Sequence, residues 1–247
     1  MDAIDSLTWP EAARLAGANA LGLWPLGSIE AHGPHLPLAT DLFISRAVAA
    51  RAGERLAARG YAPFLLPELP FGVTRYAAEF SGTLGLSPGT LKSIIGDVAA
   101  ETGRHGLRRL VLVNNHLEPA QLETLAEAVL AASAGPVRVI APNPCERRWA
   151  RTLGDEFKRG ECHAGSYETS LVIAGGGRVD TSLAKGLAPV PIDLAKAMRE
   201  GRKTFREAGA DQAYFGRPAE ASREEGDALL ARLVEMVVAE VLEKLPL

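Results

Sequence analysis

Glutamate and histidine lie two residues apart at three places in the chain. These places contain three of the five histidines and are Glu30-Ala31-His32, His116-Leu117-Glu118 and Glu161-Cys162-His163. In an extended segment, side chains two residues apart leave the backbone on the same side. Carboxylate oxygens and imidazole nitrogens are common ligands of Zn²⁺ and Mn²⁺. The repeated spacing therefore indicates a metal site.

Asp41 is a further candidate ligand, because the glycine and prolines between it and His32 can turn the chain back. With it, the candidate set offers three carboxylates and two imidazoles: Glu30, His32, Asp41, His116 and Glu118. This set can hold two divalent cations if one carboxylate bridges them, and Asp41 is the best bridge on position alone. Two such cations lower the pKa of a shared water and polarise a carbonyl, and a hydrolase uses both effects.

Each candidate ligand also has a structural explanation of its own. Asp41 suits a helix N-cap, where its oxygen accepts a backbone N–H. His116 alone is typical of a hydrogen-bonded histidine at a strand end, and Glu118 of an acidic residue in the first turn of a helix. The shared spacing, rather than any single residue, favours the metal site.

The elements that position these residues are predicted from hydrophobic patterning. Short, almost unbroken apolar runs predict buried strands over residues 21–26, 62–66, 109–114 and 137–141. Apolar residues spaced three and four apart predict helices over residues 41–58, 88–104, 119–132 and 227–244. This alternation predicts an α/β fold, a single-domain three-layer αβα sandwich over residues 1–247 with a mostly parallel sheet.

The carboxyl ends of the strands are where an open parallel sheet binds its ligand. Two of the Glu/His segments follow predicted strands directly, and the third, in residues 161–170, precedes a predicted short helix. Residues 67–87 and 176–226 are rich in proline and glycine and resist assignment. We expect lids, binding loops or oligomer contacts there.

Composition excludes several classes of protein. The 247 residues carry 27 Lys+Arg and 30 Asp+Glu, a net charge of −3, with no basic block of the kind that binds nucleic acid. No run approaches the ~18 apolar residues of a membrane span, and the acidic N-terminus is unlike a signal peptide. We therefore expect a cytoplasmic protein without a membrane partner. Cys145 and Cys162 form no CxxC pair and are expected to be reduced thiols.

The same residues carry a resemblance to the creatininase (creatinine amidohydrolase) family. Residues 25–41, PLGSIEAHGPHLPLATD, are very similar to the opening signature of that family, and residues 163–170, HAGSYETS, also match. Looser similarity at residues 80–83 and 216–226 extends the resemblance over most of the chain. It implies an αβα sandwich with a dinuclear Zn/Mn centre that hydrolyses non-peptide C–N bonds of small amides, often in a hexamer.

The resemblance also implies a role for each candidate residue. Glu30 and His116 would hold one cation, and His32 and Glu118 the other. Asp41 would bridge the two cations, and His163 would act as general acid/base toward the leaving nitrogen. Glu161 and Glu168 would orient the histidine or the water.

The chain departs from creatininase itself at positions that concern the substrate. Leu117 stands where creatininase has a tyrosine, and Lys158 and Arg159 stand near the position of a tryptophan. Loss of these aromatic residues disfavours creatinine and introduces cations that suit an anionic substrate. The sequence predicts hydrolysis of a cyclic amide, lactam or similar small amide, with creatininase activity proper as the alternative.

Two further classes of function stay open. One is a metal-independent cysteine hydrolase that uses Cys162 and His163, which is disfavoured because sequence neighbours rarely point at one another. The other is a non-catalytic assembly protein in which the cations only join the loops. A histidine and a glutamate beyond the ligand set argue against it, because a structural site needs no proton donor.

Overall fold

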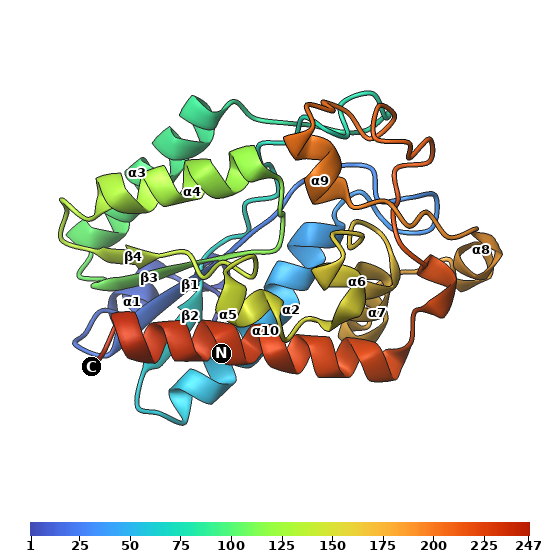
Figure 1. Cartoon of the computed structure of the whole chain (residues 1–247). Helices are drawn as coiled ribbons and strands as arrows, with labels where there is room; N and C mark the ends of the chain where they lie inside the picture. The colour runs from blue at the N-terminus through green and yellow to red at the C-terminus, as the bar shows by residue number, and fades with distance from the viewer.

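A four-stranded parallel sheet forms the centre of the computed structural model, which describes residues 1–247 (Figure 1). The strand order is β2-β1-β3-β4, and all three pairings are parallel. The strands are β1 (Ala20–Leu26), β2 (Ala62–Leu65), β3 (Arg109–Asn114) and β4 (Arg138–Ile140). Each strand falls on a predicted apolar run, so the predicted α/β fold with a parallel sheet is confirmed.

Four long helices follow the predicted segments to within a few residues. They are α2 (Thr40–Ala57), α3 (Pro88–Arg104), α4 (Pro119–Ala132) and α10 (Arg223–Lys244). Helix α10 begins before the predicted residue 227 because the Ser222 hydroxyl accepts the Glu225 N–H and caps it earlier. In none of the helices is there a stretch of the length and apolar character that a bilayer crossing requires.

Shorter helices fill the remaining segments. They are α1 (Trp9–Ala13), α5 (Arg147–Ala150), α6 (Gly154–Lys158), α7 (Ser166–Gly175), α8 (Thr181–Gly186) and α9 (Leu194–Arg199), with single 3₁₀ turns at Ile4–Ser6 and Pro218–Glu220. Two of these helices and one 3₁₀ turn lie in the region 176–226, which was too irregular in sequence to assign.

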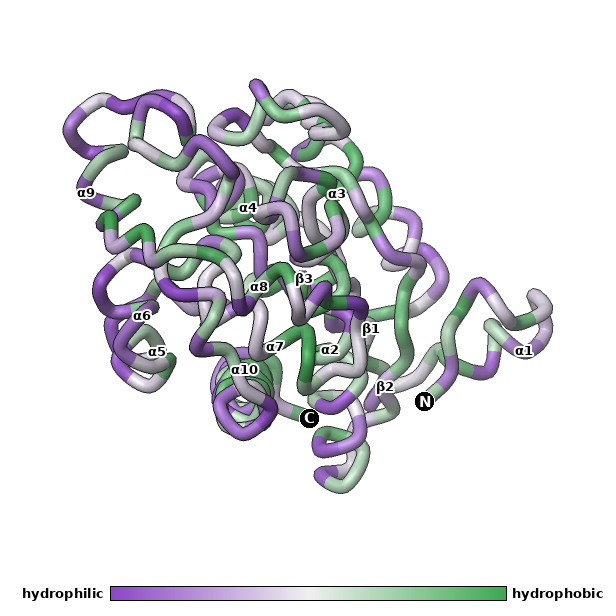
Figure 2. Tube along the Cα trace, turned by 90° about the vertical axis from the view of Figure 1, so that its right-hand side faces the viewer, coloured by the Kyte–Doolittle hydropathy of each residue, from purple (hydrophilic) through white to green (hydrophobic).

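Helices cover both faces of the sheet (Figure 1). Leu21 and Leu23 of β1 pack in one core with residues of α2, α7 and α10. Trp24 and Leu26 belong to a second core with residues of α3 and α4. The pleat that turns successive side chains to opposite faces thus produces the three layers. Helix α10 is seen nearly end-on in Figure 2, with hydrophilic and hydrophobic residues around its axis.

A third, smaller core joins the two Pro/Gly-rich regions. Ala77 from residues 67–87 packs with Phe205 and Phe215 from residues 176–226, and Ala31 from the loop after β1 joins them. The irregular regions therefore pack together beside the loop that carries Glu30 and His32.

Candidate metal centre

The loop after β1 is held close to the start of α2. Gly27 has no space for a side chain, since a Cβ there would lie 2.4 Å from the Leu42 backbone nitrogen. This close approach places Asp41, in the first turn of α2, beside the loop. The Glu30 N–H donates to the Leu38 carbonyl at 3.0 Å, which closes the loop back on itself. Turn and close approach together bring Glu30, His32 and Asp41 near one another.

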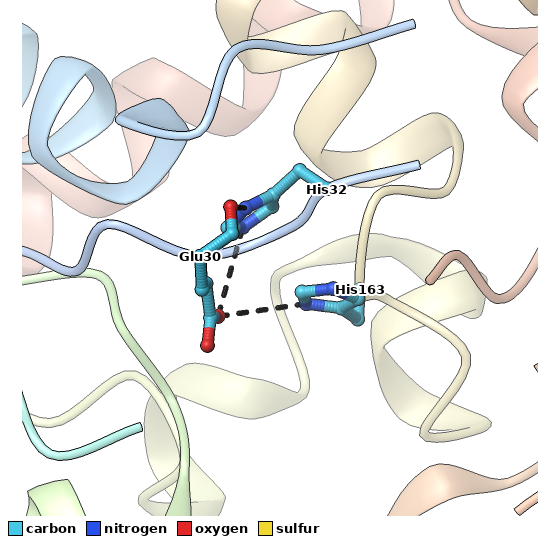
Figure 3. Close-up of side chains that lie close together, drawn as sticks. All are labelled: Glu30, His32 and His163. Atoms are coloured by element: carbon cyan, nitrogen blue, oxygen red, sulfur yellow. Dashed lines mark hydrogen bonds and ion pairs between the residues drawn. The ribbon is translucent and has the colours of Figure 1, made fainter. Parts of the chain in front are cut away.

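Six buried side chains form the donor cluster, each at most 9% exposed: Glu30, His32, Asp41, His116, His163 and Glu168. Within it, three overlapping sets each have ligand atoms within 4.8 Å of one another. Glu30, His32 and Asp41 each belong to two of these sets. Figure 3 shows one of them, in which the Glu30 carboxylate faces both His32 and His163.

Asp41 lies between two imidazoles. Its Oδ1 lies 3.2 Å from Nε2 of His32, and its Oδ2 lies 3.1 Å from Nδ1 of His116. Glu30 Oε1 approaches His116 Nδ1 at 3.3 Å, whereas Glu168 Oε2 approaches His32 Nε2 at 3.6 Å. The cluster therefore has two halves that share one carboxylate.

The backbone fixes the orientation of all three imidazoles. His32 Nδ1 lies 3.0 Å from the Glu30 carbonyl, His116 Nε2 lies 2.8 Å from the Val73 carbonyl, and His163 Nε2 lies 3.0 Å from the Ala31 carbonyl. A carbonyl oxygen only accepts, so each of these ring nitrogens carries the hydrogen. In a neutral imidazole, the opposite nitrogen then turns its lone pair toward the carboxylates, as in a metal ligand.

The cluster contains three carboxylates and three imidazoles, so it carries an excess of negative charge when the imidazoles are neutral. Burial alone lowers the pKa of His32, but the negative charges of Asp41 and Glu168 outweigh it and raise that pKa to about 10. Burial raises the pKa of Asp41, yet His32 and His116 hold it well below its usual range. Divalent cations can supply this positive charge in place of protons. The buried Oδ2 of Asp41 has no hydrogen-bond partner, which also fits a cation ligand.

Glu118 lies outside the donor cluster. Its carboxylate accepts the Arg75 N–H at 2.8 and 3.0 Å and the Tyr76 N–H at 3.3 Å. The sequence grouped Glu118 with His32, whereas the structure brings Glu168 to His32 instead. Both carboxylates are buried, and both line the same cavity.

Glu161 also faces away from the cluster. Its Oε2 lies 2.9 Å from Nη1 of Arg217 and 3.2 Å from Nε of Arg159. Arg159, one of the two cations noted in the sequence, is therefore paired within the protein. Glu161 anchors the Arg217 segment next to the loop of His163.

Glu168 reaches the cluster because one contact before the start of α7 and one in its middle hold the helix in place. Ala164 adopts a positive φ of 51°, and its N–H donates to Glu168 Oε2 at 2.6 Å. At the other side, a Cβ on Gly226 of α10 would lie 1.9 Å from the Ser170 carbonyl oxygen, so only glycine permits this packing. The close contact between α7 and α10 thus places Glu168 against His32.

Two positioning residues were missed in the sequence. Thr74 donates its hydroxyl to Glu30 Oε2, which leaves Glu30 Oε1 to face His116. Glu156 accepts the N–H groups of Tyr167 and Arg217, both at 2.7 Å, and so ties the start of α7 to the Arg217 segment. No motif or residue spacing in the sequence marks Thr74 or Glu156, because their contacts join distant parts of the chain.

A cavity of about 650 Å³ opens above the cluster. Five of the six members of the cluster, all but His32, line it together with Glu118. Apolar and aromatic side chains line the rest of the wall: Tyr76, Leu117, Leu122, Phe157, Leu194, Met198 and Phe205. Tyr76, Leu194, Met198 and Phe205 come from the two Pro/Gly-rich regions. These regions therefore supply part of the cavity wall.

Comparison with known proteins gives concordant results. The family model described as creatininase, creatinine amidohydrolase, matches residues 5–241. Creatinine amidohydrolase from Pseudomonas putida is 35% identical over 121 residues, which are 47% of this chain and 45% of that enzyme. The mycofactocin precursor peptide peptidase of Mycobacterium tuberculosis is 30% identical over 233 residues, 90% of this chain and 84% of that protein. A solved structure described as Creatininase Mn aligns with a TM-score of 0.76 at 25% identity and covers 99% of both chains.

Proposed function

The chain belongs to the creatininase family of amidohydrolases, and from this premise we propose that it holds two divalent cations, Zn²⁺ or Mn²⁺, and hydrolyses the C–N bond of a small amide. The observation that carries the proposal is Asp41, whose two oxygens face two different imidazoles in a buried, negatively charged cluster. Such a carboxylate is suited to bridge two cations. A large cavity above the cluster gives a substrate access to it.

The donor sets divide the ligands between the two cations. Glu30, Asp41 and His116 would hold one cation, and His32, Asp41 and Glu168 the other. This assignment keeps four of the five ligands expected from the sequence and replaces Glu118 by Glu168. When bound, the pair supplies a water of lowered pKa and polarises the amide carbonyl.

His163 is the proton carrier of the proposed reaction. Its Nε2–H donates to the Ala31 carbonyl, so Nδ1 faces the cluster with its lone pair, 4.0 Å from Glu30 Oε1. The ring packs on Phe205, with centroids 4.3 Å apart, which restricts its rotation. From this position Nδ1 can accept a proton from the attacking water and deliver it to the leaving nitrogen.

Glu118 and Glu161 act as positioning residues in this proposal. Glu118 fixes the backbone of residues 75 and 76, next to the Thr74 hydroxyl that holds Glu30. Glu161 holds the Arg217 segment beside the His163 loop. We assign no cation to either carboxylate, because neither belongs to a set of donor atoms that lie within 4.8 Å of one another.

The cavity favours a substrate other than creatinine. Leu117, which stands where creatininase has a tyrosine, lines the cavity. Lys158, which stands near the position of a creatininase tryptophan, lines it too. One family relative carries the name of a precursor peptide peptidase, so the amide bonds handled in this family are not confined to creatinine. Creatininase activity proper remains the second candidate, supported by the Pseudomonas putida relative.

The structure disfavours a cysteine hydrolase. Burial, together with the negative charge of Glu168, raises the pKa of the Cys162 thiol well above its ordinary value. A thiol of this kind is a poor nucleophile at neutral pH. The ring nitrogens of His163 face Ala31 and Glu30, with no hydrogen bond to Cys162.

The proposal is tested by measuring metal content and hydrolysis together. Purified protein is expected to contain Zn or Mn by elemental mass spectrometry and to hydrolyse members of a panel of lactams, cyclic ureides, creatinine and short peptides. Asp41→Asn should lose both properties. Metal-free protein with undiminished amide hydrolysis would contradict the proposal, whereas bound metal without any turnover would favour an assembly protein. A homo-oligomer, implied by the family resemblance, stays a prediction for light scattering.

A further inference from the structure

One cation on the cavity wall has no partner in the protein. Arg199, the last residue of α9, lines the cavity with Leu194 and Met198 of the same helix. Arg199 is exposed, as is Arg202, and its guanidinium makes no hydrogen bond or ion pair within the protein. A guanidinium carries up to five N–H donors, so an unpaired one on a cavity wall offers a fork for an anion.

The acidic groups near Arg199 are already engaged. Glu200 lies 3.8 Å from Lys196 Nζ, and Asp193 Oδ1 accepts the Lys196 N–H at the start of α9. Lys158, the other cation on the cavity wall, lies 3.1 Å from Asp155. Arg199 is therefore the cation on this wall whose charge the protein leaves free.

The cavity wall carries groups of opposite charge and apolar side chains. The buried carboxylates of Glu30, Asp41 and Glu168 line it, and so does Arg199 of α9. Leu117, Leu122 and Met198 contribute to the wall. A volume of about 650 Å³ is in the range that accommodates drug-sized ligands, far larger than a five-membered lactam.

We propose that the substrate is an elongated amide bearing a carboxylate, which Arg199 binds while the scissile amide lies against the donor cluster. This inference rests on the proposed function and adds the class of substrate to it. A carboxylate matches the planar guanidinium with two parallel hydrogen bonds.

The carboxylate takes no part in the bond changes. Water adds its oxygen to the acyl carbon, the C–N bond breaks, and the leaving nitrogen gains a proton, so an acid and an amine are formed. Arg199 acts through binding alone. Its loss should therefore raise KM for the charged substrate and leave kcat nearly unchanged.

The test compares substrates that differ only in the carboxylate. N-benzoyl-leucine and N-benzoyl-leucinol place the charge, or a neutral hydroxyl, on the amine side of the amide. Glutaryl anilide and pentanoyl anilide place the charge, or a neutral methyl group, on the acyl side. The wild type should prefer the charged member of one pair by at least about tenfold in kcat/KM, the usual gain from a charged hydrogen bond.

Arg199→Gln should abolish this preference by lowering kcat/KM for the charged member about tenfold. The matched control is Arg202→Gln, which removes a nearby exposed arginine that does not line the cavity and should keep the preference. Arg199→Lys should retain part of it. Equal hydrolysis of both members of each pair by the wild type would overturn the proposal, as would equal effects of the two glutamine variants.

Direct binding separates this inference from the proposed function. Calorimetric titration of N-benzoyl-leucine and glutaryl anilide into the protein should give a Kd for one of them that Arg199→Gln weakens about tenfold and Arg202→Gln does not. Such binding without any turnover would refute hydrolysis and keep the carboxylate site. Hydrolysis of neutral amides without Arg199-dependent binding would refute the carboxylate site and keep the proposed function.

Discussion

The Glu118 carboxylate accepts the backbone N–H of Arg75 through both oxygens, at 2.8 and 3.0 Å. On the same segment, the Val73 carbonyl accepts the Nε2–H of His116 at 2.8 Å. Between these two contacts lies Thr74, whose hydroxyl holds Glu30. The end of β3 therefore positions Glu30 through the segment 73–76.

Substitution of Glu118 should separate positioning from ligation. Glu118→Gln keeps an oxygen for the Arg75 N–H and should cost about 1 kcal/mol of stability, while the protein retains its full metal content. Asp41→Asn is the matched comparison and should lose most of the metal, because it weakens both halves of the cluster. Elemental analysis of both variants checks this. If Glu118→Gln instead lost about one cation, Glu118 would be a ligand together with His32, as expected from the sequence.

Glu168 gives the reciprocal prediction. Its Oε2 belongs to one donor set only, with His32 and Asp41. Glu168→Gln should therefore lose about half of the bound metal and keep the rest at Glu30 and His116. Titration of chelated protein with Zn²⁺ by calorimetry should show one strong site in this variant and two in the wild type. Two unchanged sites would remove Glu168 from the ligands.

Chelation should destabilise the wild type. Without cations, the buried carboxylates of Glu30, Asp41 and Glu168 are balanced by protons alone. A ligand present at a thousandfold its Kd stabilises the folded state by about 4 kcal/mol, so Tm should fall by roughly 10 °C after chelation. Scanning calorimetry with and without EDTA measures the shift. Asp41→Asn serves as control and should respond little, and an equally large shift there would place the metal elsewhere.

His163 should be needed for turnover and not for metal binding. Loss of a general acid/base typically lowers kcat by 10²- to 10⁴-fold, so His163→Gln should show a loss of about this size. Its metal content should remain that of the wild type, because both halves of the cluster are complete without it. Loss of a cation from His163→Gln would instead identify the Nδ1 atom as a ligand.

The sequence predicted those parts of the fold and site that depend on the hydrophobic pattern within one segment. The runs that form β1 and β3 are almost wholly apolar because helices cover both faces of the sheet. The loop residues Glu30 and His32 follow β1 directly, and a parallel sheet fixes that edge as the ligand site.

The parts that sequence did not predict depend on contacts between distant segments. The two-residue spacing from His116 indicated Glu118 as a ligand, whereas the structure groups Glu168 with His32 and Asp41. The tight packing of Gly226 against Ser170 and the hydrogen bonds from residues 75 and 76 decide it. No sequence pattern indicates the role of Thr74, because its partner Glu30 is 44 residues away.

Glu240 of α10 should make stability depend on pH independently of the metal centre. Burial raises the pKa of this carboxyl, but hydrogen bonds from Lys244, Trp149 and Arg148 outweigh it and lower the pKa below its ordinary value of 4.5. A carboxyl whose pKa is lower in the folded state stabilises the protein above pH 4.5, and this contribution is lost as pH falls through the folded-state pKa. Glu240→Gln should therefore be about 2 kcal/mol less stable than the wild type at pH 7, with a smaller difference below pH 4.5.

Urea unfolding at pH 7 and below pH 4.5 measures this difference in stability. Glu243→Gln is the control, because the partially exposed pair of Glu243 with Arg148 should contribute little. A difference that stayed constant with pH would show that Glu240 acts through packing and not through its charge.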